Sequence, residues 1–124
     1  MRTEKVMYFT EKEEEFTNLL VEIGTSRNVA RVLVFLASTP KATSRAIEQS
    51  ADLRQSEVSI AMYYLIGKNW ITRRESKPES KGRVVNIYEL SKPFHEIMDI
   101  IEHEKKKEAT AQLALLQKLQ YHLR

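Results

Sequence analysis

Two helices joined by a very short turn, over residues 42–68, constrain the fold of this chain more than any other feature. The sequence ATSRAIEQSA at 42–51 predicts a short helix, and Asp52 and Leu53 supply the turn. The sequence RQSEVSIAMYYLIGK at 54–68 then predicts a longer helix. Because the first helix is too short to be stable alone, the pair must pack on a shared core.

The longer of these helices has one apolar side and one mixed side. Val58, Met62 and Leu65 recur at helical spacing with Ala61 beside them, which predicts packing on the two preceding helices. The opposite side begins with short polar residues, and two larger groups follow. A helix with such a leading end fits the major groove of duplex DNA, which is wide enough to admit it. The residues of that side are Gln55, Ser56, Ser59, Ile60 and Tyr63.

A basic β-hairpin is predicted directly after the longer helix. Trp70-Ile71-Thr72 starts a strand, and residues 73–83 join it to a second strand at 84–90 through turn-forming proline, serine and glycine. Either parity of the second strand can face the core, and we favour the one that points Tyr88 and Leu90 inward. Helix, turn, helix and hairpin in this order predict a winged helix-turn-helix, a mostly α fold with a small β-hairpin wing (α+β).

Two further helices are predicted ahead of this pair. Thr10 is a suitable cap for the first, because acidic residues fill the following turn. Ser26 can cap a second helix that ends near Ser38 and is apolar almost all round, so we expect it to be central and buried. Ser44 is the expected cap of the short third helix.

A long C-terminal helix is predicted after Ser91 and Pro93. If it ran unbroken to Arg124 it would be about 48 Å long at the usual rise per residue. Part of its apolar seam follows the alternating spacing of four and three residues that is typical of coiled coils. A seam that protrudes from a small domain needs a partner, so we expect a homodimer. The residues expected at its interface are Ile97, Ile101, Leu113, Leu116, Leu119 and Leu123.

The length of 124 residues fits one domain with one appended element. We expect a flexible N-terminal segment at 1–10, a winged helix-turn-helix domain at 11–92 and a dimerisation helix at 93–124. A hydrophobic content of 42% with 30% charged residues indicates a chain that can bury a core, which excludes wholesale disorder.

Positive charge is concentrated in the middle of the chain. Residues 41–92 hold ten basic and six acidic side chains, whereas residues 1–40 hold five and six, and residues 93–124 hold five of each. The excess therefore lies in the segment predicted to be the winged helix, as expected for a surface that faces phosphates.

Several classes of function are excluded or disfavoured. The chain has no cysteine, which excludes disulfides, thiolate zinc sites and thiol redox sensing. It has only three glycines and contains no glycine-rich phosphate loop, no nucleophile elbow and no HExxH motif. We therefore expect that the chain is not an enzyme. No apolar run approaches the roughly 18 residues of a membrane span, and the N-terminus leads into no signal-peptide core, so we expect a cytoplasmic protein.

Five short stretches follow a known pattern. They are TSRAI at 43–47, ADL at 51–53, EVS at 57–59, Leu65 and WITR at 70–73. This series resembles the MarR, TrmB and ArsR-like winged-helix regulators, and among them the small archaeal ones most. The resemblance covers roughly residues 26–92 and implies a transcriptional regulator that binds DNA.

The chain departs from that pattern at two positions. Arg54 stands where these families often have serine or threonine as a helix cap, so another group or water must cap the first turn. Asn69 replaces the common glycine after the helix, and asparagine can take the left-handed conformation that glycine takes there.

Two groups of residues are expected to contact DNA. The leading end and outer face of the longer helix would reach base edges, and the hairpin would meet phosphates or enter the minor groove. An ordinary solvated helix face is the alternative for the first group, although solvent alone does not favour its two larger apolar groups. For the second group, the alternative is that the basic residues only keep the edge of the hairpin soluble and prevent aggregation. The residues are Arg45, Arg54, Gln55, Ser56, Ser59 and Tyr63 from the helices, and Arg73, Arg74, Lys77, Lys81 and Arg83 from the hairpin.

A metal-sensing site on the C-terminal helix is one alternative. His95, Asp99 and His103 recur along one helix face with Glu102 adjacent, but their spacing does not reproduce that of the ArsR-like sensors. Solvated polar residues on the outer side of a dimer helix explain them better, and Asp99 with His103 can form a helix-stabilising pair. We therefore expect no metal and no cofactor.

Taken together, these patterns predict a homodimeric regulator that binds double-stranded DNA. The alternative is a winged helix that serves as a protein-interaction module in a larger transcription or chromosome complex. The sequence names neither an operator nor an effector, and it does not separate a repressor from an activator.

Overall fold

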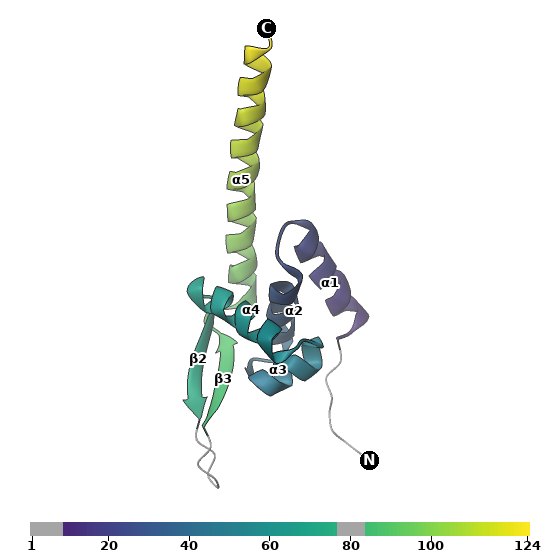
Figure 1. Cartoon of the computed structure of the whole chain (residues 1–124), viewed down its shortest axis with the longest axis vertical. Helices are drawn as coiled ribbons and strands as arrows, with labels where there is room; N and C mark the ends of the chain where they lie inside the picture. The colour runs from purple at the N-terminus through teal and green to yellow at the C-terminus, as the bar shows by residue number, and fades with distance from the viewer. Residues whose placement is uncertain (1–8, 77–83) are drawn as a thin grey trace. The chain divides into compact units, whose positions relative to one another are not determined.

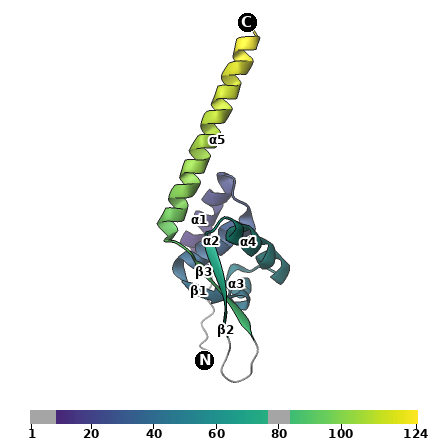
Figure 2. The ribbon, with the colours of Figure 1, turned by 90° about the vertical axis from the view of Figure 1, so that its left-hand side faces the viewer.

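Helices account for most of the residues that the structure describes. The computed structural model describes residues 9–76 and 84–124, and Figures 1 and 2 show it in two views. The contacts divide the chain into two units, with the boundary between Lys92 and Pro93. Along the chain the elements are α1 (Glu11–Glu22), α2 (Arg27–Ser38), β1 (Lys41–Thr43), α3 (Ser44–Ala51), α4 (Gln55–Gly67), β2 (Ile71–Ser76), β3 (Val85–Leu90) and α5 (Phe94–His122).

Helix α2 is the central helix of the first unit, as its sequence predicts. Ser26 caps it, since the Ser26 hydroxyl accepts a hydrogen bond from the backbone N–H of Val29 at 3.4 Å. Every residue from Val29 to Leu36 is buried, and α2 contacts α1, α3 and α4. The core of the unit therefore surrounds a helix that is apolar on nearly all sides.

The cap predicted for α1 is also present. The Thr10 hydroxyl accepts from the N–H of Glu13 at 3.1 Å, and the Glu13 carboxylate accepts from the N–H of Thr10 at 2.8 Å. This reciprocal capping box satisfies two backbone amides that the helix leaves without partners. Of the N-terminal segment that we expect to be flexible, residues 1–8 lie outside the described part of the chain.

The wing is a three-stranded sheet where the sequence predicts a two-stranded hairpin. The strand order is β1-β3-β2, with both pairings antiparallel. Ala42 and Thr43 belong to β1, with Ala42 opposite Tyr88, so the prediction that the third helix begins at residue 42 is wrong. A strand of three residues forms because β3 would otherwise present an unpaired edge to which this segment can bond.

The cap of α3 differs from the prediction by one residue. Thr43 is the N-cap, in extended conformation, and its hydroxyl accepts from the N–H of Ala46 at 3.1 Å. Ser44 is instead the first helical residue, and its hydroxyl donates to the Glu48 carboxylate at 3.2 Å. Thr43 can serve both elements because an N-cap keeps the backbone angles of a strand.

The parity favoured for the second strand of the hairpin is confirmed at Tyr88 alone, because Leu90 is only half-buried. Tyr88 is buried and lies opposite Ala42 on one side and Arg73 on the other. Val84, which precedes the strand with the same parity as Tyr88, is 48% exposed, and the alternative pair Val85 and Ile87 is half-buried. The sheet therefore directs one face, which includes Tyr88 and Ile71, into the core of the first unit.

Helix α5 is continuous over 29 residues, Phe94–His122. Near its start Ile97 and Ile101 are buried. The leucines from Leu113 to the C-cap residue Leu123 are exposed, with exposed fractions between 53% at Leu116 and 79% at Leu123. Among the described residues, no helix combines the length and apolar character needed to cross a membrane.

Candidate nucleic-acid interface

The turn between α3 and α4 is held by backbone geometry. Asp52 takes the left-handed conformation with φ of 58°, and its N–H bonds to the carbonyl of Glu48. The N–H of Leu53 donates to the same carbonyl at 3.0 Å. Aspartate tolerates this conformation better than most residues, so the turn needs no glycine. The result is a sharp change of direction that lets α4 start at Gln55, three residues after Asp52.

The backbone amide of the N-cap residue of α4 is bonded from within the helix. Arg54 is the N-cap residue, but its guanidinium has no acceptor atom and cannot cap. The Glu57 carboxylate instead accepts from the N–H of Arg54 at 2.9 Å. Glu57 therefore satisfies the amide of Arg54 itself, whereas the first-turn amides of α4 have no side-chain cap hydrogen bond.

The two sides predicted for α4 are both observed. Val58, Ala61, Met62 and Leu65 are all buried, and α4 contacts both α2 and α3. The opposite side is exposed along its whole length. We call the residues at its centre the outer row; they are Ser56, Ile60, Tyr63 and Gly67, at successive intervals of four, three and four.

Two residues of the outer row are large and well exposed. Ile60 is 72% exposed and Tyr63 is 83% exposed. Gln55 and Ser59 are exposed on the flank of the outer row, and Arg45 is exposed on α3. Every residue of the helices that the sequence proposes for DNA contact is therefore open to solvent.

Arg73 and Arg74 lie on opposite faces of the wing. Arg73 is opposite Tyr88 and two residues from the buried Ile71, so it shares their face of the sheet. Arg74 lies on the other face, where its Nε is 3.7 Å from the Glu89 carboxylate. Both arginines were predicted to contact DNA together, whereas only Arg73 lies on the side on which α4 packs against β2. Lys77, Lys81 and Arg83 lie outside the described residues.

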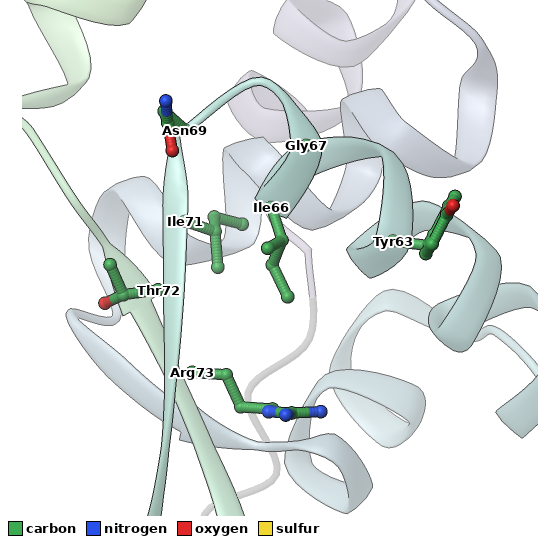
Figure 3. Close-up of a pocket in the computed structure, with 7 residues that line it drawn as sticks. All are labelled: Tyr63, Ile66, Gly67, Asn69, Ile71, Thr72 and Arg73. Carbon is green, nitrogen blue, oxygen red and sulfur yellow. The ribbon is translucent and has the colours of Figure 1, made fainter.

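A groove of about 650 Å³ runs between the end of α4 and strand β2. Figure 3 shows Ile71 and Arg73 pointing from β2 toward the helix, while Thr72 points away. Isoleucine side chains from both elements, with the backbone of a helical glycine, give the groove a largely apolar wall, and Arg73 supplies a cationic group. The lining residues are Tyr63, Ile66, Gly67, Asn69, Ile71, Thr72 and Arg73.

The far end of this groove is fixed by Asn69. Its φ is 66°, which confirms the left-handed conformation predicted from the resemblance. The Asn69 carbonyl accepts a hydrogen bond from the Ser91 hydroxyl, and the N–H of Ser91 donates to the Trp70 carbonyl at 2.8 Å. These bonds tie the exit of α4 to the end of β3, so the helix and the wing are held in one arrangement within the first unit.

A buried arginine that the sequence analysis did not single out supports the turn from behind. Arg31 of α2 is 7% exposed, and its Nε donates to the carbonyl of Ala51 at 2.7 Å. Its Nη1 lies 3.1 Å from the Glu14 carboxylate, and its guanidinium carbon lies 4.3 Å from the centre of the Phe9 ring. The available signal was one charged residue within the apolar run from Val29 to Leu36. Such a residue is rarely buried without partners.

The polar residues of the C-terminal helix do not form a metal site in the described structure. His95, Asp99, Glu102 and His103 are all exposed on α5. Within residues 9–76 and 84–124, no group of three or more histidine, aspartate or glutamate side chains could hold a metal ion.

Comparison with known proteins gives a likeness of fold. No family model matches the sequence, and no curated protein matches it. A possible transcriptional regulator from Methanosarcina mazei Go1 is 19% identical, with a TM-score of 0.61 over 81% of this chain and 82% of that one. A MarR family regulator from Silicibacter pomeroyi is 17% identical, with a TM-score of 0.52 over 90% and 82%. One from Neisseria meningitidis is also 17% identical, with a TM-score of 0.51 over 86% and 83%.

At these identities the likeness concerns the fold alone. It agrees with the fold class predicted from the sequence, namely mostly α with a small β wing and a long C-terminal helix. The chain therefore has the winged helix-turn-helix fold of MarR-like transcriptional regulators.

Proposed function

We propose that this chain is a sequence-specific transcriptional regulator that binds double-stranded DNA in the cytoplasm, and that it is not an enzyme. Helix α4 would lie in the major groove, and the wing would contact the phosphate backbone or the minor groove. The observation that carries the proposal is the exposed face of α4, with polar residues at its leading end and Arg73 beside its far end. An exposed helix flanked by cationic groups matches the shape and the negative charge of a duplex groove.

The exposed residues take two roles in this proposal. Side chains of α4 that reach base edges would select the sequence, and arginines and lysines around them would neutralise phosphates. The proposed base-reading residues are Gln55, Ser56, Ser59 and Tyr63. The proposed phosphate contacts are Arg45, Arg54, Arg73 and Arg74, together with Lys77, Lys81 and Arg83 of the wing tip.

We further propose that the chain acts as a homodimer paired through α5. Leu113, Leu116, Leu119 and Leu123 are all more than half exposed in the single chain. Burying each such side chain stabilises a complex by roughly 1.5 to 3 kcal/mol, which favours pairing of two copies. A symmetric dimer would present two α4 helices to half-sites about one DNA turn apart.

The dimer is tested by sedimentation equilibrium at high micromolar concentration. The intact chain should sediment at twice its monomer mass, and Leu116→Glu should shift it toward monomer because a charge cannot be buried in the leucine seam. Gln117→Glu, a change of the same charge beside it, is the matched control. A strictly monomeric wild-type chain would exclude the pairing.

DNA binding is tested by genomic footprinting with the tagged full chain, followed by titration of the recovered duplexes at physiological salt. We expect saturable binding to a limited set of sites. Double replacement of Gln55 and Ser59 by alanine should reduce the preference for those sites, while Glu15→Ala on the exposed side of α1 should not.

One observation favours a second candidate function, a protein-interaction module. Ile60 and Tyr63 are 72% and 83% exposed on the face of α4, and apolar groups of this size on a surface often mark a docking site for a protein. In that case duplex DNA should show no saturable binding at physiological salt, so the same titration separates the two candidates.

A further inference from the structure

The composition of α4 restricts which base pairs it can recognise, if the proposed function holds. No lysine or arginine occurs from Gln55 to Gly67, and Glu57 is the single acidic residue. The Glu57 carboxylate is already bonded to the N–H of Arg54 at 2.9 Å. The commonest base-specific contact in the major groove is a lysine or arginine bonded to guanine. The middle of α4 cannot make this contact.

The middle of α4 carries apolar surface instead. Ile60 and Tyr63 lie in the outer row, within one turn of each other, and are 72% and 83% exposed. Among the groups that bases display in the major groove, the C5-methyl of thymine is the one that such side chains can cover. Ser56 and Ser59 beside them can bond to any base, so they do not shift this preference.

Charge around the outer row distinguishes a duplex from a protein partner. Arg54 lies at the leading end of α4, and Arg73 lies across the groove that Tyr63 and Gly67 line at the other end. The centre between them is uncharged. A duplex has the same arrangement with charges of the opposite sign. Negative phosphates line both edges of the groove, and uncharged base edges lie between them.

We propose that Ile60 and Tyr63 determine specificity by packing on thymine methyl groups, so that each half-site has A·T pairs beneath the middle of α4. Gln55, at the leading end, is placed to bond with an adenine, which glutamine reads through N6 and N7. This inference rests on the proposed function, and it adds the class of base pair that the helix selects.

The test removes single methyl groups from the DNA. The full chain is used to select from a random 24-base-pair duplex library, and the preferred duplex is then remade with deoxyuridine replacing each thymidine in turn. Deoxyuridine keeps the base pair and lacks only the C5-methyl. Loss of one buried methyl should weaken binding about fourfold at one or two positions per half-site, as measured by fluorescence anisotropy.

Two protein variants assign the effect to the outer row. In Ile60→Ala the ratio of the affinities for thymidine and deoxyuridine should fall to about one at the position that Ile60 covers. Tyr64→Ala is the matched control, because Tyr64 is 48% exposed but lies outside the outer row. Its ratio should equal that of the wild type. Because the ratio compares two duplexes on one protein, a change in folding does not affect it.

The outcomes separate this inference from the proposed function. If binding is saturable and selective but no deoxyuridine replacement changes the affinity, the thymine inference is wrong and the regulator remains. Selection of G·C pairs beneath the middle of α4 would likewise show that the thymine inference is wrong, while the proposed regulator function would remain. If no duplex binds saturably, both the inference and the proposed function fail, and the exposed face of α4 is better explained as a protein-docking surface.

Discussion

The Nε of Arg31 donates a hydrogen bond of 2.7 Å to the carbonyl oxygen of Ala51, which joins the central helix to the last residue of α3. The same side chain pairs with Glu14 of α1 at 3.1 Å. Arg31 therefore links three helices at the turn that aims α4.

We expect Arg31→Ala to destabilise the chain by about 2 to 4 kcal/mol. The change leaves the buried carbonyl of Ala51 without its donor and removes the partner of Glu14. Glu14→Gln should cost below about 1 kcal/mol, because the Glu14 side chain is 44% exposed and solvent screens the pair. Urea unfolding followed by circular dichroism measures both. Arg27→Ala, on the exposed start of α2, is the control, and an equal loss for Arg27→Ala and Arg31→Ala would contradict the role of Arg31.

Arg73→Ala should weaken binding to all duplexes about equally and lower the slope of log affinity against log salt by about one unit. Arg74→Ala should lower the slope by less, because Arg74 lies on the other face of the wing and is paired with Glu89 at 3.7 Å. Titrations at four salt concentrations give both slopes. An unchanged slope for Arg73→Ala would exclude a phosphate contact at that residue.

Gln55→Ala should relax the preference for one base pair of the half-site. A bidentate contact to a base is worth about 1 to 3 kcal/mol of discrimination, so the affinities for the preferred and the substituted pair should converge by that amount. The measurement is a titration of the four duplexes that differ at that pair. A uniform loss across the four would mean that Gln55 does not read a base.

Gly67→Ala should affect stability and DNA binding in opposite directions. Within a helix, alanine is more favourable than glycine by roughly 0.5 to 1 kcal/mol, and a Cβ at Gly67 meets nothing within 4 Å. Thermal unfolding should therefore shift upward. Because Gly67 lines the groove beside α4, the added methyl should weaken duplex binding. Higher stability with unchanged affinity would place the DNA away from this end of the helix.

Local signals in the sequence were enough to predict most of the helices. Thr10 and Ser26 cap the helices for which they were proposed, and the buried side of α4 follows directly from its spacing. The left-handed conformation of Asn69 was predicted from the resemblance, because asparagine can take the place of the common glycine. In each case the deciding interaction lies within one or two turns of the residue, so a short window of sequence contains it.

Apart from the one-residue shift of the α3 cap, the errors concern contacts between distant residues. Strand β1 has three residues and no alternating pattern, and it forms only because Ala42 lies opposite Tyr88 of β3. Arg31 bonds to residues 17 and 20 positions away. The separation of Arg73 from Arg74 depends on Ile71 being inward, and once that is known the alternation of the strand assigns both arginines.

The hydrogen bond from the N–H of Arg54 to Glu57 has a consequence for how proteins of this kind can diverge. Since a main-chain amide is the donor, residue 54 contributes nothing to it that another amino acid, proline excepted, would lack. Substitutions there can alter the contact with phosphates while the helix start survives. Position 57, in contrast, should tolerate little beyond glutamate and glutamine.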